Sequence, residues 1–186
     1  MMNENVFIAL LHHPVYNKDG DVITTTVTNY DLHDISRAAR TYGVNKYYVV
    51  NQLKSQQSLV RRMRDYWTSG FGADYNNTRH EAFKVMEITD TLEDTIEDIE
   101  KRTGEKPILI TTSAQKNKET ISFPKLRKKM HANNKPYLII FGTGWGLTKE
   151  IIEQSDYLLE PVTGNTDYNH LSVRSAASII MDRLLS

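Results

Sequence analysis

The chain has 186 residues, and its 23 Lys and Arg balance its 23 Asp and Glu, so the formal net charge is zero. Hydrophobic residues make up 39% and charged residues 25%, which is ordinary for a soluble globular protein, and the length predicts a single domain over residues 1–186. The absence of cysteine excludes disulfides, thiolate metal sites and cysteine nucleophiles, and it suits a cytoplasmic protein. No apolar run approaches the roughly 18 residues of a membrane span, so no membrane partner is expected.

Apolar runs, which predict buried strands, alternate with amphipathic segments, which predict helices. In chain order we expect a strand at 6–11, an extended arm at 22–28, a helix at 31–42, a strand at 47–50, a basic helix at 58–68, a loop at 69–80, a strand at 83–88, an acidic helix at 91–102, a strand at 107–111, a basic helix at 123–132, a strand at 137–141, a helix at 148–154, a strand at 157–159 and a long helix at 169–185. The loop at 69–80 is rich in glycine and polar residues and is expected to be mobile. This alternation predicts an α/β fold with a largely parallel sheet that helices cover on both faces.

Residues 137–147 read YLIIFGTGWGL, so a buried strand runs directly into three alternating glycines. Glycine has no Cβ and tolerates positive φ, which lets the main chain of such a turn approach a ligand closely. Open α/β sheets build small-molecule sites from strand, glycine turn and helix in this order. The spacing G-x-G-x-G differs from the dinucleotide motif G-x-G-x-x-G, and the phosphate-binding motif G-x-x-x-x-G-K-[ST] is absent. A tight structural turn without a ligand explains the pattern equally well.

Three late strands are each followed by a loop that could contribute to one crevice. The first ends in Thr112-Ser113-Ala114, the second in GTGWGL, and the third in Glu160-Pro161-Val162 with a loop that reaches Leu171-Ser172-Val173. Near the N-terminus, DLHDISRAARTYG places Arg37 six residues before Gly43. These features together resemble the SPOUT superfamily of RNA methyltransferases, and among them the stand-alone bacterial group of S-adenosylmethionine-dependent enzymes.

The resemblance implies a C-terminal half tied in a deep trefoil knot, S-adenosyl-L-methionine (SAM) as cofactor, a tRNA or rRNA substrate, a homodimer and no metal. Ser172 is equally well explained as the N-cap of the last helix. The residues that the resemblance places at the cofactor are Thr112, Ser113, Ala114, Phe141, Gly142, Thr143, Gly144, Gly146, Leu147, Glu160, Pro161, Val162, Leu171, Ser172 and Val173.

Two residues are the candidates for catalysis. The guanidinium of Arg37 could grip a phosphate or stabilise an oxyanion on the acceptor nucleotide, or it could simply form a surface salt bridge. Asp167 lies before the last helix, where one base-methylating SPOUT enzyme carries an aspartate. The ribose-methylating members have Asn and Glu where this chain has Asp31 and Thr143, so base and ribose methylation both stay open. The general base is open as well, between Asp167 and a group of other residues, namely Asp31, His33, Asp34 and His170.

Local basic clusters can bind RNA phosphates although the whole chain is neutral, and a solvated helix face explains each cluster equally well. The RNA-binding candidates are Arg37, Arg40, Arg61, Arg62, Arg64 and Arg174. The adjacent His12 and His13 do not predict a metal site, because neighbouring side chains of a strand point to opposite faces. A non-catalytic nucleotide- or RNA-binding module is the alternative function. The glycine spacing and the lack of G-x-S-x-G argue against a Rossmann oxidoreductase or a hydrolase.

Overall fold

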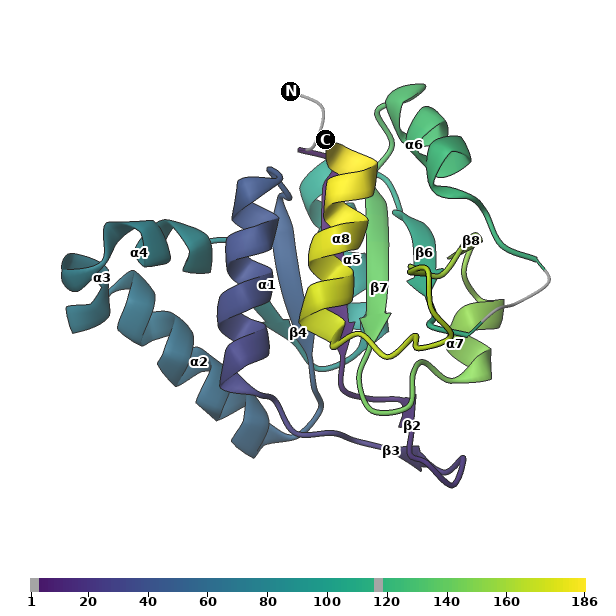
Figure 1. The fold of residues 1–186 in the computed structure, drawn as a ribbon. Helices are drawn as coiled ribbons and strands as arrows, with labels where there is room; N and C mark the ends of the chain where they lie inside the picture. Colours follow the sequence, from purple (N-terminus) through teal and green to yellow (C-terminus); the bar gives the residue numbers. More distant parts are fainter. Residues whose placement is uncertain (1–3, 116–118) are drawn as a thin grey trace.

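The computed structural model describes residues 4–115 and 119–186, and a six-stranded sheet in the order β5-β4-β1-β7-β6-β8 forms its centre (Figure 1). All neighbouring strands of this sheet run parallel. The six strands are β1 (Val6–Leu11), β4 (Lys46–Val50), β5 (Met86–Thr89), β6 (Ile108–Thr112), β7 (Tyr137–Gly142) and β8 (Tyr157–Leu159). All six residues of β1 are buried, as a central parallel strand with both faces covered requires. The predicted α/β fold with a largely parallel sheet is confirmed.

Helices cover both faces of the sheet, and each face has its own hydrophobic core. On one face α1 and α8 lie side by side, with α2, α4 and α6 beside them, and α5 lies behind the sheet (Figure 1). The second core lies between the sheet and the apolar sides of α5 and α7. The helices are α1 (Asn29–Thr41), α2 (Lys54–Thr68), α3 (Phe71–Tyr75), α4 (Asn77–Phe83), α5 (Leu92–Thr103), α6 (Phe123–His131), α7 (Lys149–Glu153) and α8 (Val173–Leu185).

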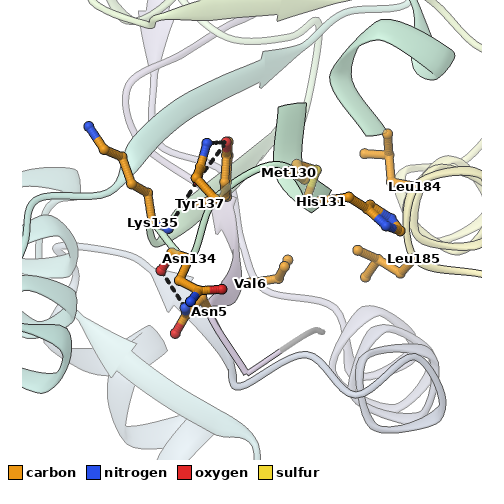
Figure 2. A pocket seen from close by; sticks show the side chains of 10 residues that line it. Asn5, Val6, Met130, His131, Asn134, Lys135, Tyr137, Leu184 and Leu185 are labelled. Carbon is orange, nitrogen blue, oxygen red and sulfur yellow. Dashed lines mark hydrogen bonds between the residues drawn. The ribbon is translucent and has the colours of Figure 1, made fainter. Parts of the chain in front are cut away.

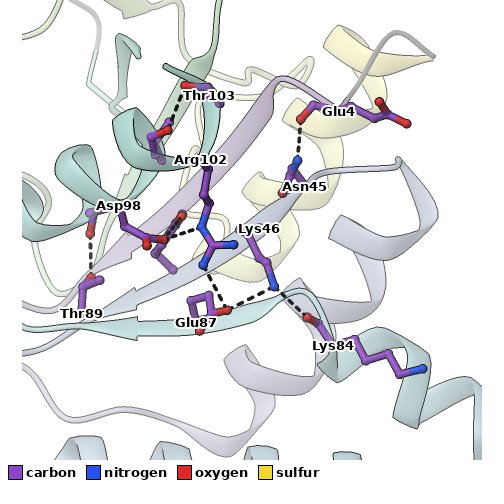
Figure 3. A network of polar contacts seen from close by, with 12 residues as sticks. Glu4, Asn45, Lys46, Lys84, Glu87, Thr89, Asp98, Arg102 and Thr103 are labelled. Carbon is purple, nitrogen blue, oxygen red and sulfur yellow. Dashed lines mark hydrogen bonds and ion pairs between the residues drawn. The ribbon is translucent and has the colours of Figure 1, made fainter. Parts of the chain in front are cut away.

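The acidic helix α5 is fixed to the sheet by a polar network as well as by its apolar side (Figure 3). Asp98 accepts a hydrogen bond from the Arg102 guanidinium at 2.7 Å and another from the Tyr48 hydroxyl at 2.7 Å. Glu87 of β5 pairs with Arg102 at 3.6 Å and with Lys46 at 3.1 Å. Asp98 and Arg102 of α5 therefore bind the neighbouring strands β4 and β5 of the same chain.

Several predicted segments differ from the structure. The loop expected at 69–80 is wrong, because the segment contains α3 and most of α4. The side chain of Asn76 accepts a hydrogen bond from the Arg79 N–H at 3.0 Å and so caps α4, which continues to Phe83. As a consequence the strand expected at 83–88 begins only at Met86.

The extended arm expected at 22–28 contains only a two-residue strand, β3 (Val22–Ile23), which pairs antiparallel with β2 (Val15–Tyr16). The sequence analysis did not predict β2. The helix expected at 58–68 begins earlier, at Lys54, and the helix expected at 169–185 begins later, at Val173. The loop before α8 is therefore four residues longer than predicted, because Ser172 caps the helix.

The two edges of the sheet differ in character. At the amino ends of β1 and β7 the chain encloses a cavity of about 150 Å³, which polar side chains such as Asn5, Asn133 and Lys135 line together with the end of α8 (Figure 2). At the opposite edge, the carboxyl ends of the strands carry the loops that the sequence analysis singled out. Within residues 4–115 and 119–186, no helix is long and apolar enough to cross a membrane. The same residues contain no group of three or more His, Cys, Asp or Glu side chains that could hold a metal.

Candidate active site

The three loops that follow β6, β7 and β8 begin at one edge of the sheet, because these strands are parallel neighbours. The Thr112 hydroxyl at the end of β6 donates a hydrogen bond to the Ile140 carbonyl of β7 at 2.9 Å. The Asn169 side chain, in the loop after β8, donates to the Ala114 carbonyl at 2.9 Å. The structure thus brings the loop after β8 into contact with the loop after β6. Ser113 is half-buried between these two contacts.

Gly144, in the turn after β7, is required by a close contact with the β2–β3 hairpin. Gly144 has φ +58°, and a Cβ at this position would lie 2.8 Å from the Tyr16 carbonyl oxygen. Tyr16 donates its N–H to the Gly146 carbonyl at 3.0 Å and accepts from the Trp145 N–H at 2.9 Å. A Cβ on Gly142 would lie 2.8 Å from the Leu147 nitrogen. One side of the glycine turn is therefore filled by this protein's own chain, and a ligand has to approach from the other side.

A partly buried row of polar groups fixes the turn further. The Thr143 hydroxyl donates to the Leu11 carbonyl at 3.0 Å and lies 2.5 Å from the Thr25 hydroxyl. Thr25 in turn lies 3.0 Å from Nδ1 of His12. Because Thr143 donates to Leu11, Thr25 donates to Thr143 and His12 donates its Nδ1 proton to Thr25. Nε2 of His12 then carries only a lone pair, and it has no hydrogen-bond partner among the described residues.

His12 is neutral in this arrangement. The residue has no exposed surface, and this burial lowers its pKa to about 4, although the negative charge of Asp31 acts in the opposite direction. A neutral histidine is the form that can donate from one nitrogen and leave the other unprotonated. This row of hydrogen bonds therefore requires that His12, beneath the glycine turn, stays uncharged.

The side chains of the loop after β8 are partly structural. The Glu160 carboxylate accepts a hydrogen bond from the Phe123 N–H at 2.7 Å, at the start of α6. The Ser172 hydroxyl accepts from the Ser175 N–H at 3.3 Å and caps α8. Pro161, Val162 and Val173 are half-buried, and the latter two pack against the core beneath α8. The cap role expected for Ser172 as an alternative is thus present.

Apolar side chains at this edge divide into buried and exposed ones. Phe141 and Leu147 are buried in the cores on opposite faces of the sheet. Trp145 is 65% exposed and Leu171 is 46% exposed, so both are available to a ligand. Large apolar side chains exposed beside glycine-rich main chain are the usual surroundings of an aromatic ligand ring.

The two catalytic candidates lie on the surface. Arg37 is exposed on α1, and Asp167 is exposed in the loop before α8. In the part of the chain that the structure describes, neither side chain forms a hydrogen bond or an ion pair. The structure does not bring the two into contact with each other.

Arg174 at the start of α8, by contrast, is held by two carboxylates of α1. Its guanidinium lies 3.3 Å from Asp31 and 3.4 Å from Asp34, and it lies over the Tyr30 ring at 5.7 Å. Asp31 is 5% exposed and also accepts a hydrogen bond from the Thr28 hydroxyl at 2.5 Å. The arginine predicted to bind RNA thus links the beginnings of α1 and α8.

The remaining predicted RNA-binding arginines differ in how far acids neutralise them. Arg40 pairs with Glu81 at 3.7 Å, and Arg64 lies 3.5 Å from both Asp65 and Glu87. Arg61 donates to the neutral amide oxygen of Gln57 at 3.3 Å. Arg62 is exposed and forms no ion pair within residues 4–115 and 119–186. The basic cluster of α2 therefore keeps a charge without an ion pair at Arg62 among the described residues.

Sequence reasoning missed the hairpin that packs on the glycine turn and the pair between Asp31 and Arg174. The short strands of the hairpin have no periodicity long enough to detect. Asp31 and Arg174 are 143 residues apart in the chain. The only signal in the sequence was Asp31 itself. It stands where ribose-methylating members have Asn, and it adds a negative charge at the start of α1.

Comparison with known proteins identifies a family and several relatives of this chain. A family model described as SAM-dependent RNA methyltransferase matches residues 5–186. An uncharacterized protein of Aquifex aeolicus is 46% identical over 186 residues, which cover 100% of this chain and 91% of that protein. A tRNA (guanine-N(1)-)-methyltransferase of Oleidesulfovibrio alaskensis is 39% identical over 181 residues, which cover 97% of this chain and 42% of that protein. This chain thus spans less than half of that longer relative.

Solved structures share the fold. The SpoU methyltransferase AviRb from Streptomyces viridochromogenes, in complex with the cofactor AdoMet, superposes with a TM-score of 0.58 at 14% identity. The match covers 97% of this chain and 58% of that chain. At this level of identity the similarity supports the arrangement of strands and helices and not the identity of individual site residues.

Proposed function

The chain belongs to the family of SAM-dependent RNA methyltransferases, and we propose that the loops after β6, β7 and β8 hold its methyl donor. The observation that carries the proposal is the gathering of these loops at one edge of the sheet, where Asn169 reaches the Ala114 carbonyl. When bound, SAM supplies a methyl group activated by the positive charge on sulfur. The alternative of a non-catalytic binding module is not favoured, because the family match extends over residues 5–186.

The residues at this edge fit such a cofactor. SAM combines an aromatic base with polar ribose and amino-acid groups, so its site needs apolar side chains beside accessible main chain. Trp145 and Leu171 supply exposed apolar surface. Gly146 has no atom within 4 Å of the position that a Cβ would occupy, which leaves the main chain open there. We therefore keep the residues of the three loops as the cofactor-binding set.

Methyl transfer from sulfur is an in-line displacement, and alignment alone contributes about 7–11 kcal/mol in well-oriented systems. The task of this chain is to fix donor and acceptor in line and to accept the proton that the acceptor releases. Arg37 is suited to hold a phosphate of the acceptor nucleotide, because its guanidinium is exposed and forms no ion pair among the described residues. Asp167 is the proposed proton acceptor.

We propose tRNA as the RNA to test first. The Oleidesulfovibrio relative is named a tRNA (guanine-N(1)-)-methyltransferase, and more than half of that protein lies outside the match. The acceptor atom is therefore not carried over from that relative. Where ribose-methylating members have Asn, this chain has Asp31, which pairs with Arg174. The charges at the proposed site therefore differ from those of ribose-methylating members.

Four further parts of the proposal concern the whole molecule. The chain returns from edge strand β8 to α8, which packs against β7 and α1, and on the way Asn169 meets the loop after β6. We infer that this return forms the deep trefoil knot and that residues 1–186 act as one methyltransferase domain. The adjacent outer faces of α1 and α8 are the proposed contact of a homodimer, with Arg37 completing the partner's site. The cytoplasm is the proposed location, because RNA is the substrate.

The cofactor site is tested by calorimetry with SAM. Leu171→Asp places a charge at the proposed adenine wall, and we expect SAM affinity to fall at least about tenfold. Leu59→Asp is the matched control, because Leu59 is 43% exposed on α2, away from the loops. Equal SAM affinity in both variants, or no SAM binding by the folded wild type, would contradict the proposed site.

Catalysis is tested by transfer of labelled methyl groups from SAM into tRNA and, separately, rRNA from cells that lack this gene. We expect Arg37→Ala to reduce transfer at least about a hundredfold while SAM binding stays unchanged. Arg40→Ala is the control, since Glu81 already neutralises that guanidinium. Full transfer by Arg37→Ala would remove Arg37 from the mechanism, and absence of transfer into either RNA by wild type would contradict the proposed substrate.

A further inference from the structure

The segment between β4 and β5 carries a concentration of large apolar side chains on the surface. Phe71 is 70% exposed, Tyr75 is 76% exposed, and Tyr66 and Leu59 are each more than two-fifths exposed. Helices α2, α3 and α4 project from the side of the molecule beyond α1 (Figure 1). Clustered apolar surface of this kind marks an interaction site, because single exposed apolar residues are common and groups of them are not.

The aromatic rings of this surface contact one another and the main chain of α3. The rings of Phe71 and Tyr75 are stacked, with centroids 6.0 Å apart and an interplanar angle of 20°. A Cβ on Gly72 would lie 2.6 Å from the Tyr66 ring and 2.7 Å from the Trp67 ring, so the main chain of α3 rests directly on these two aromatics. Trp67 is in turn in edge contact with Tyr66 at 4.9 Å. The four aromatic side chains therefore form one group around α3.

The charge beside the rings is positive. Leu59, Arg62 and Tyr66 are three and four residues apart on α2, so they share one side of the helix. Arg62 forms no ion pair in the described part of the chain, and Arg79 lies over the Trp67 ring at 4.7 Å without an acidic partner there. The nearby acids are Asp65, which Arg64 pairs at 3.5 Å, and the exposed Asp74. A polyanion with flat apolar faces complements this combination of charge and rings.

We propose that Tyr66, Phe71 and Tyr75, together with Arg62, form a platform on which unpaired bases of the substrate RNA stack. This inference rests on RNA being the substrate of the enzyme. Bases stack on exposed aromatic side chains irrespective of sequence, and an adjacent guanidinium neutralises the backbone phosphate. Because α2 starts just after β4, at the edge that carries the cofactor loops, RNA that enters the active site can extend along α2 to the platform.

The test separates stacking from general hydrophobic contact. Phe71→Leu/Tyr75→Leu keeps apolar surface and removes the ring faces, whereas Phe71→Trp keeps a ring face. Binding of a short oligouridine and of unmodified tRNA is measured by fluorescence anisotropy, with SAM binding by calorimetry as the test of folding. We expect the double variant to lose about tenfold in RNA affinity per ring at unchanged SAM affinity, and Phe71→Trp to bind as the wild type does.

The role of Arg62 has its own readout. Arg62→Gln should reduce the slope of log affinity for oligouridine against log salt by about 0.7, the value for one single-strand phosphate contact. Lys149→Gln is the control, because Lys149 lies on α7 and already pairs with Glu153 at 3.4 Å. An unchanged slope in Arg62→Gln would overturn the assignment of this arginine to a phosphate.

Two outcomes would overturn the platform itself. Unchanged RNA affinity of the leucine double variant at unchanged SAM affinity would show that bases do not stack there. A change in sedimentation of that variant without a change in RNA affinity would assign the surface to a second copy of this chain. If the wild type binds oligouridine through the rings but transfers no methyl group, the platform stands and the catalytic proposal fails, so the two are distinguishable.

Discussion

Two glycine-containing segments of this molecule resemble each other in sequence but differ in what lies beside the glycine. Residues 142–146 follow a buried strand, and residues 70–72 follow a helix. In both, a glycine is needed because another part of the chain lies where a Cβ would be. At Gly144 that part is the Tyr16 carbonyl of the hairpin, and at Gly72 it is the rings of Tyr66 and Trp67.

The two segments differ in whether the group that contacts the glycine can move. At Gly144 the obstacle is main chain, the φ is +58°, and the next two residues, Trp145 and Gly146, are hydrogen-bonded to Tyr16 of the hairpin. At Gly72 the obstacle is side chain, and the residue sits in a short surface helix. A glycine turn beside the proposed cofactor site should therefore be rigid, whereas the support of the aromatic platform should be adjustable.

The largest effect is expected for Gly144→Ala. The substitution forces a left-handed conformation on a residue with a Cβ and drives that Cβ into the Tyr16 carbonyl, so the hairpin must move. We expect the free energy of unfolding to fall by about 3 kcal/mol, from left-handed strain and overpacking together. Urea denaturation measures this loss. The matched control is Gly20→Ala in the same hairpin, since Gly20 has φ +87° and no atom within 4 Å of its Cβ position.

Gly20→Ala should cost only the conformational part, about 1 kcal/mol. A loss of equal size in the two variants would mean that the hairpin does not press on the glycine turn. In that case the contact between Tyr16 and Gly144 would not distinguish this segment from the one at Gly72.

A smaller effect is expected from the histidine beneath the turn. Burial lowers the pKa of His12 to about 4, so between roughly pH 6.5 and 4 the unfolded chain binds a proton that the folded chain excludes. Stability from this residue is present above about pH 6.5 and is lost as the pH falls toward 4, by about 2 kcal/mol at pH 5. Urea denaturation of wild type and His12→Asn at several pH values measures the difference in slope.

Carboxylates titrate in both proteins, so only the difference between wild type and His12→Asn reports on His12. Between about pH 8 and 7 the histidine is neutral in both states, and the two proteins should then lose or gain stability in parallel. Identical slopes between pH 6.5 and 5 would show that a charged His12 is tolerated. The row from His12 through Thr25 to Thr143 would then not hold the glycine turn.

The sequence predicted the strands and helices well because their signal is local. The run at 137–141 and the spacing of Leu92, Ile96 and Ile99 identify a strand and a helix without knowledge of any neighbour. The edge of the sheet where we propose the site follows from the same pattern, since parallel strands end together. The reasons for the glycines do not follow, because Tyr16 and Gly144 are distant in sequence. The same holds for Asp31 and Arg174, whose pairing links the beginnings of α1 and α8.

The smallest effect is expected for Gly72→Ala. The added methyl group meets the Tyr66 and Trp67 rings at 2.6 and 2.7 Å, and overpacking of this kind costs about 1–3 kcal/mol. Alanine also favours a helix over glycine by up to about 1 kcal/mol, so the net loss in the free energy of unfolding should be about 1 kcal/mol. The control is Gly164→Ala, where no atom lies within 4 Å and no loss is expected. Because α3 must shift on the Tyr66 ring, Gly72→Ala should weaken RNA binding while SAM affinity stays unchanged. Loss of SAM affinity in this variant would mean that the platform and the glycine turn are coupled, and the contrast between the two segments would fail.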